Sequence, residues 1–252
     1  MNVVLLQGIN HGVGTSSIGA AISWALGVHN YTTLFVNAAD ENCQYCTDAL
    51  MGIKSDNSSI KGWTDYISKE NVNQDLNLYQ CADKCFYLPY GTGHGSVKAK
   101  DSVKSLIHRI YELNKLDFVI VDGGVRSSTM AKAFCSFCDL CISVTLADAN
   151  CMLRLNETTP YDHEYFLINR FMMKSTVMNS IELLLRKSPL GKNFFNYVIQ
   201  YDESMNRAFM EMMPVTRFLP IASSAKNIEK LMVDLILIED LINGRKEQEE
   251  EV

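Results

Sequence analysis

The chain has 252 residues, of which 47% are hydrophobic, 21% charged and 10% aromatic, and its formal net charge is −6. This composition excludes a disordered, collagen-like or coiled-coil chain, and the length suits one large α/β domain or two small ones. Because Lys and Arg form no concentrated block, we expect neither nucleic acid nor an anionic membrane surface as a partner.

The chain also lacks the sequence features of a membrane or exported protein. It has no apolar run of about 18 residues, which a membrane-spanning helix requires. Its first residues, MNVVLLQG, lack the basic segment and the long apolar run of a signal peptide. We therefore expect a cytoplasmic protein whose cysteines are reduced thiols.

Short apolar runs alternate with amphipathic stretches along most of the chain. The apolar runs predict strands over residues 3–6, 32–36, 76–79, 86–88, 117–122, 140–146 and 165–168. The amphipathic stretches predict helices over residues 16–28, 103–113, 181–186, 202–213 and 228–242. Strands that are apolar on both faces indicate an α/β fold with a mostly parallel sheet and helices on both faces. We expect a single domain over residues 1–245, followed by an acidic tail over 246–252.

The most informative segment follows the first strand and reads QGINHGVGTSS from Gln7 to Ser17. Gly12 and Gly14 have no Cβ, so the backbone there can turn tightly and approach an anion. The N–H groups of residues 13–17 and the positive end of the next helix would then face a phosphate. Ser16 is placed to offer its hydroxyl to Mg²⁺. The alternative is a glycine-rich turn that binds nothing.

Thr15 and Asp122 occupy two positions that are important in an ordinary P-loop NTPase. A lysine normally follows the last glycine and reaches the β- and γ-phosphates, but Thr15 stands there. Without this lysine the site lacks a positive charge that would stabilise the transition state, so we expect hydrolysis to be impaired more than binding. Asp122 ends the strand DFVIVD, where a Walker-B acid would orient the magnesium shell.

Together these residues resemble the MinD/ParA-type ATPases, which have a deviant Walker A motif. The segments LQGINHGVGTSSIGAAISWAL and ADANCMLRL more closely resemble the BcsQ (YhjQ) family, the MinD-like subunits of bacterial cellulose-secretion systems. FLINRF and VIQYDESMNRA add to this similarity. The resemblance implies a P-loop NTPase-like fold that binds ATP and Mg²⁺. It also implies a face-to-face homodimer and other cytosolic cellulose synthase subunits as partners.

The same resemblance shows which ATPase residues this chain has replaced. The signature lysine of the wider family falls on Asn10, and the adjoining glycine position falls on His11. The water-orienting aspartate falls on Ala39, and the acid two residues before it falls on Asn37. Asp40 lies one residue away and is the candidate catalytic residue for a slow ATPase. We therefore expect efficient hydrolysis to be lost.

The resemblance further implies that the adenine base contacts Asn169 and Arg170, whereas the alternative for Asn169 is a polar cap at a strand end. The predicted magnesium ligands are Ser16 and Asp122. The predicted nucleotide-binding residues are Asn10, His11, Gly12, Val13, Gly14, Thr15, Ser16, Ser17, Asn169 and Arg170.

The functional expectation is an accessory protein of cellulose biosynthesis that dimerises around Mg-ATP. It would regulate or assemble the cytosolic part of the synthase complex, with weak or absent hydrolysis. It would be recruited to the inner membrane through partners, because glutamates follow the last helix and disfavour direct membrane insertion. The alternatives are a nucleotide-free scaffold of the same complex and a slow ATPase that uses Asp40.

A different class of enzyme, a nicotinamide-dependent oxidoreductase, is a further alternative. The glycine spacing also occurs in short-chain dehydrogenases, and Tyr111 and Lys115 resemble their catalytic pair. Tyr111 precedes the strand at 117–122 instead of following it on a long helix, which disfavours this class.

The eight cysteines leave two interpretations open. Some have spacings typical of zinc ligands, and the best set for such a site is Cys43, Cys46, Cys81 and Cys85. The run Cys135-x-x-Cys138-x-x-Cys141 falls at a helix-to-strand junction, where small thiols pack well. We favour thiols packed in the core for all of them.

Overall fold

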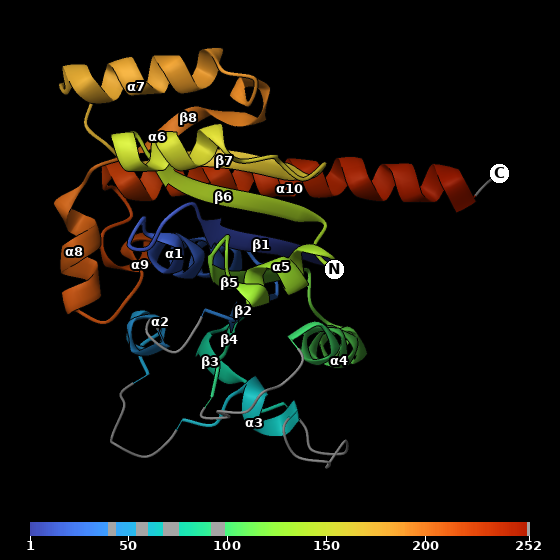
Figure 1. Ribbon diagram of the computed structural model, residues 1–252. Coiled ribbons are helices and arrows are strands. Elements are labelled where there is room, and N and C mark those ends of the chain that lie inside the picture. Colours follow the sequence, from blue (N-terminus) through green and yellow to red (C-terminus); the bar gives the residue numbers. More distant parts are fainter. Residues whose placement is uncertain (40–43, 54–59, 68–75, 92–98, 251–252) are drawn as a thin grey trace.

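The computed structural model describes residues 1–39, 44–53, 60–67, 76–91 and 99–250. Its centre is an eight-stranded sheet with the strand order β3-β4-β2-β5-β1-β6-β7-β8 (Figure 1). Neighbouring strands are parallel except for β3, which is antiparallel to β4 at one edge. The strands are β1 (Asn2–Gly8), β2 (Thr33–Asn37), β3 (Tyr79–Ala82), β4 (Cys85–Leu88), β5 (Phe118–Val125), β6 (Leu140–Leu146), β7 (Glu164–Phe171) and β8 (Phe194–Gln200).

Helices cover both faces of this sheet. Side chains alternate along β1, so Val4 and Leu6 face the core that includes α1, α9 and α10, whereas Val3 and Leu5 face α4 and α5. The helices are α1 (Thr15–Val28), α2 (Gln44–Leu50), α3 (Trp63–Ile67), α4 (Ala99–Glu112), α5 (Thr129–Cys135), α6 (Ala149–Asn156), α7 (Thr176–Lys187), α8 (Glu203–Met210), α9 (Val215–Phe218) and α10 (Ser223–Glu250). The predicted α/β class, with a mostly parallel sheet between helical layers, is confirmed.

The strand order places a crevice at the carboxyl end of β1. The chain leaves β1 toward β2 on one side of the sheet, and β6 and β7 lie on the other side. In open parallel sheets such a reversal leaves room for a ligand between the strand ends. The loop at 9–14 and the beginning of α1 lie at this point.

Three features of the fold differ from the expectations. The edge strand β3 spans Tyr79–Ala82 and not the predicted 76–79. β8 was not predicted, because this edge strand, FFNYVIQ, alternates buried with partly exposed residues and contains polar side chains. The helix α10 continues through Glu250, past the predicted end of this helix at residue 242 (Figure 1). Lys, Glu and Gln are good helix formers, so the acidic segment 246–250 extends the helix. Within the described residues, no helix is both long and apolar enough to cross a bilayer.

Candidate functional site: a glycine loop at the carboxyl edge of the sheet

The loop after β1 turns into α1 through two residues of positive φ. Gly12 has φ +71° and Gly14 has φ +98°, a backbone region that other residues adopt only with strain. Gly14 is the N-cap of α1, and within the described residues no side chain caps this helix. The first intrahelical hydrogen bond runs from Ile18 N–H to Gly14 O. The N–H groups of the preceding turn therefore remain available to an anion.

Asn169, at the end of β7, holds this loop in place. Its Nδ2 donates to the Val13 carbonyl at 2.8 Å, and its Oδ1 accepts from the Arg170 N–H at 2.8 Å. The side chain is 3% exposed. A Cβ on Gly14 would lie 2.4 Å from Asn169 Nδ2. Glycine is thus required at position 14 for two reasons, its backbone conformation and its contact with Asn169.

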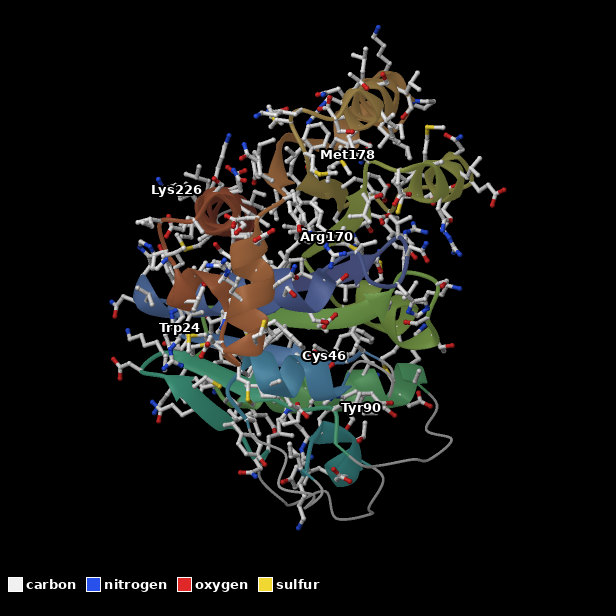
Figure 2. The ribbon with its side chains drawn as sticks, turned by 90° about the vertical axis from the view of Figure 1, so that its left-hand side faces the viewer. Trp24, Cys46, Tyr90, Arg170, Met178 and Lys226 are labelled. Atoms are coloured by element: carbon white, nitrogen blue, oxygen red, sulfur yellow. The ribbon has the colours of Figure 1, made fainter. Side chains whose placement is uncertain are left out.

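Arg170 follows in a strained conformation. Its φ is +53°, in the left-handed region that costs a non-glycine residue about 1–2 kcal/mol. Figure 2 shows it on the carboxyl edge of the sheet, with Cys46 of α2 across from it, and both residues line the same cavity. Strain of this kind is concentrated at functional sites, where surrounding contacts hold it.

Asp122 is a fully buried carboxylate beside the loop, paired in register with Asn37 of the neighbouring strand. Burial raises its pKa, while hydrogen bonding with Ser16 and the Gly124 amide acts in the opposite direction. Its Oδ1 accepts from Gly124 N–H at 3.1 Å, but Oδ2 has no hydrogen-bond partner in the part of the chain that the structure describes. A buried carboxylate oxygen without a donor is costly, and Mg²⁺ or a water in its shell would satisfy it. The residues present therefore fit a magnesium ion.

These groups surround a cavity of about 550 Å³, within the size range of cofactor sites. Of the predicted nucleotide-binding residues, all except Val13 line it. Val13 contributes its carbonyl to Asn169 while its side chain is buried in the core. Asp122 lies behind the lining with no exposed surface, so it would act through the magnesium shell.

The opposite wall of the cavity was not predicted. Tyr201 follows β8, and Met205 and Phe209 come from α8. These side chains give this wall the apolar surface that a planar base needs. The signal in the sequence is weak, because it consists of apolar residues at helical spacing, which are equally typical of core packing.

The residues that matter for hydrolysis are the least favourable part of the site. Ala39 lines the cavity where the family's water-orienting aspartate is expected, and Asn37 uses its Oδ1 to accept from the Ala39 N–H. Thr15 is 8% exposed and offers no positive charge. Asp40, the candidate catalytic residue, lies outside the described residues.

The alternative interpretation, a zinc site at Cys43, Cys46, Cys81 and Cys85, gains no support from the described residues. Cys43 lies outside the described residues, and Cys46 is exposed, whereas Cys85 is fully buried. The group that could hold a metal in the described part of the chain lies elsewhere. The packed-thiol interpretation holds for Cys85 and for Cys151, which is 1% exposed.

Comparison with known proteins identifies the family and the fold of this chain. A family model described as "Cellulose biosynthesis protein BcsQ" matches residues 1–234. The BcsQ of Escherichia coli (strain K12) is 25% identical over 237 residues, covering 90% of this chain and 91% of the relative. The MinC:MinD cell division protein complex of Aquifex aeolicus has a TM-score of 0.75 at 16% identity, covering 94% of this chain and 96% of the other. The septum site-determining protein MinD of Pyrococcus horikoshii OT3, complexed with Mg-ADP, has a TM-score of 0.67 at 17% identity and covers 93% and 95% of the two chains.

The structural likenesses establish the fold as that of the MinD/ParA ATPases, and the match of the family model extends over most of the sequence. The predicted resemblance is thereby confirmed. This chain belongs to the family of the cellulose biosynthesis protein BcsQ.

Proposed function

We propose that this protein binds Mg-ATP in the cavity at the carboxyl edge of the sheet and uses it to hold a conformation. The observation that carries the proposal is the beginning of α1. Gly14 lines the cavity and opens the helix with positive φ, and none of the described side chains caps the helix. The triphosphate would accept from the N–H groups of residues 13–17. Hydrogen bonds to a charged group contribute about 1.5–3 kcal/mol each, so several of them offset the absence of a P-loop lysine.

Two further groups support the same ligand. Arg170 supplies a positive charge within the lining, and the Mg²⁺ ion would be held by Ser16 and, through its water shell, by Asp122. When bound, the ion would offset the negative charge of the phosphate oxygens. The MinD of Pyrococcus horikoshii, of the same fold, carries Mg-ADP. Adenine would lie toward Asn169 and the wall formed by Met205 and Phe209.

Hydrolysis is proposed to be weak or absent. Thr15 and Ala39 replace the groups that would stabilise the leaving phosphate and orient water, and Asn37 is uncharged. A slow reaction would have to depend on Asp40. Phosphate release measured over hours separates the two cases: turnover that disappears in Asp40→Ala would refute the proposal of a nucleotide clamp without hydrolysis.

The bound nucleotide is proposed to hold two copies face to face. Asn10 and His11 lie at the rim of the cavity, and His11 is exposed, so a second copy could approach the phosphates there. The ordered dimer would present a surface to other cytosolic subunits of a cellulose synthase complex, which would recruit it to the inner membrane. The family description supports this setting.

The experiment is equilibrium binding of a fluorescent ATP analogue, with and without Mg²⁺. We expect saturable binding that Mg²⁺ strengthens and that Gly14→Val abolishes. Gly52→Val is the matched control, because Gly52 also has positive φ (+75°) but does not line the cavity. Absence of binding by the folded wild-type chain would favour a nucleotide-free scaffold instead. Light scattering measures the molar mass with and without ATP, and the proposed dimer requires this mass to double when ATP is present.

A further inference from the structure

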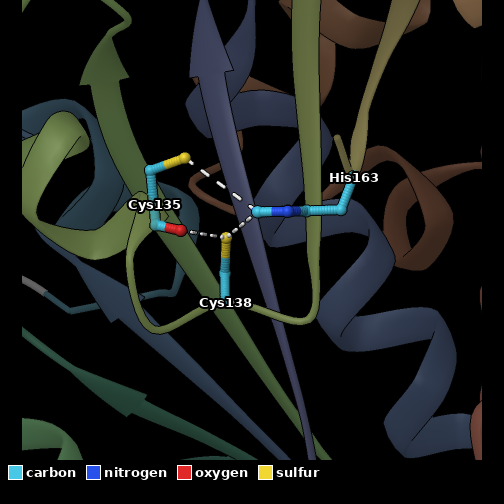
Figure 3. A group of neighbouring side chains, drawn as sticks. All are labelled: Cys135, Cys138 and His163. Atoms are coloured by element: carbon cyan, nitrogen blue, oxygen red, sulfur yellow. Dashed lines mark hydrogen bonds between the residues drawn. The ribbon is translucent and has the colours of Figure 1, made fainter. Parts of the chain in front are cut away.

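A second cluster of potential ligands lies apart from the nucleotide cavity. Cys135 is the last residue of α5, Cys138 lies in the turn toward β6, and His163 immediately precedes β7. Their ligand atoms lie within 4.8 Å of one another (Figure 3). His163 Nε2 is 4.0 Å from Cys135 Sγ and 3.4 Å from Cys138 Sγ.

The register of the sheet brings these residues together. Cys141 N–H donates to the His163 carbonyl at 2.9 Å, and Cys141 pairs with Glu164 in the β6–β7 ladder. The spacing Cys135-x-x-Cys138-x-x-Cys141 places three thiols beside that strand start, and the Cys141 side chain hydrogen bonds with Cys135. The Cys141 thiol therefore lies beside Cys135 but outside the group of three clustered ligand atoms.

The distances match a tetrahedral zinc site. With Zn–S near 2.3 Å and Zn–N near 2.0–2.1 Å, two tetrahedral ligands are about 3.6 Å apart for a sulfur and a nitrogen. The two measured distances from His163 lie on either side of this value. Two thiolates and one imidazole are a soft donor set that selects Zn²⁺ over Mg²⁺. We propose that Cys135, Cys138 and His163 bind one zinc ion.

The protonation of the cluster is compatible with a metal. The hydrogen bond from Cys141 lowers the pKa of Cys135 against the effect of burial, and His163 acts in the same direction as Cys141. Burial raises the pKa of Cys138, so without a metal this thiol holds its proton. A bound ion would displace that proton, as it does wherever thiols become ligands. Cys138 and His163 are both partly exposed, which gives an ion a path of entry.

With three protein ligands the site would leave one coordination position of the ion open to water. It would join the end of α5 to the starts of β6 and β7. These are the amino ends of two neighbouring parallel strands, and the carboxyl end of β7 borders the nucleotide cavity through Asn169 and Arg170. Zinc would therefore fix the positions of β6 and β7 relative to each other without touching the nucleotide.

The test uses the full chain, purified with a phosphine reductant and without added metal. We expect close to one zinc ion per chain by elemental mass spectrometry. Co²⁺ added to metal-free protein should give the absorption bands of tetrahedral thiolate coordination. Cys138→Ser and His163→Ala should each lower the affinity for zinc by more than the roughly 10–100-fold that loss of an outer-shell contact costs. Cys151→Ser is the control, since that buried thiol lies outside the cluster, and it should keep full occupancy.

Three outcomes would overturn the proposal. One is folded, reduced wild-type protein that binds neither Zn²⁺ nor Co²⁺ at stoichiometric concentration. The second is zinc binding that both variants retain undiminished. The third is a disulfide within the cluster in protein isolated under non-reducing conditions, together with no metal, which would identify a redox pair in place of a metal site. Because the metal titration uses the wild type, a folding defect in the variants does not obscure the result.

Discussion

Substituting Gly14 by alanine tests how the glycine loop is held. The new Cβ would lie 2.4 Å from Asn169 Nδ2, closer than such atoms approach, and the residue would keep a φ of +98°. Asn169 must move and release the Val13 carbonyl, which it contacts at 2.8 Å. Gly12→Ala is a matched control, because its φ is +71° but nothing lies within 4 Å of the added Cβ.

The expected magnitudes follow from these contacts. Left-handed strain costs each alanine variant about 1–2 kcal/mol of unfolding free energy. Gly14→Ala should lose about 1–3 kcal/mol more, because a buried carbonyl loses its donor. For a domain of this size the additional loss lowers Tm by about 2–12 °C relative to Gly12→Ala.

Thermal unfolding of the two variants, and of each combined with Asn169→Ala, measures this difference. Once Asn169 is truncated, the clash is gone, and Gly14→Ala should cost only its backbone strain. The double-mutant cycle should therefore give a coupling of about 1–3 kcal/mol between positions 14 and 169 and none between 12 and 169. Equal losses for Gly12→Ala and Gly14→Ala, or additive effects in the cycle, would refute the contact.

Three other predictions concern single charges. Burial raises the pKa of Asp48, and the hydrogen bond from Tyr87 acts in the opposite direction. The contribution of the Asp48 carboxyl to folding stability is therefore fully present below about pH 3.9, the pKa of an unfolded aspartate. This contribution is lost as pH rises through the pKa of the folded state. Asp48→Asn should remove this part of the pH profile of Tm, and unchanged profiles would contradict it. Asp122→Asn should raise the Tm of the nucleotide-free protein, because it removes a buried charge whose Oδ2 has no donor among the described residues. The same variant should abolish the effect of Mg²⁺ on ATP binding. Retained Mg²⁺ dependence would exclude Asp122 from the site. Arg170→Asn should leave stability unchanged or higher, since Asn tolerates positive φ. It should weaken ATP binding roughly 10–100-fold, because a charge-assisted contact of about 1.5–3 kcal/mol is lost. Equal affinity, with Arg170→Lys as the control, would show that the cation does not reach the phosphates.

Local pattern accounts for most of what the sequence predicted correctly. The buried run before Gly8 and the two glycines at 12 and 14 belong to contiguous segments, so strand, turn and helix could be inferred from neighbours alone. β8 escaped because it is an edge strand with half-exposed side chains and carries no continuous apolar run.

Contacts between distant residues could not be predicted in the same way. The hydrogen bond from Asn169 to Val13 joins positions 156 residues apart, and only the sheet order brings them together. His163 had no visible relation to the cysteines, because its position beside them depends on the register of β6 and β7. The cysteine spacing alone therefore left packed thiols as the simpler interpretation.

The features that cost stability are concentrated at the carboxyl edge of the sheet. Arg170 carries left-handed strain. Among the residues that the structure describes, no group donates to Asp122 Oδ2 and no side chain caps α1. Each costs of order 1–3 kcal/mol, a substantial part of the roughly 5–15 kcal/mol that stabilises a typical domain. Anion and cation together would satisfy the orphan groups, and a ligand at a hundred times its Kd adds about 2.7 kcal/mol. In a chain without a ligand, these groups would destabilise the fold and nothing would offset them. Their presence beside Thr15 and Ala39 therefore favours a nucleotide clamp over an empty scaffold.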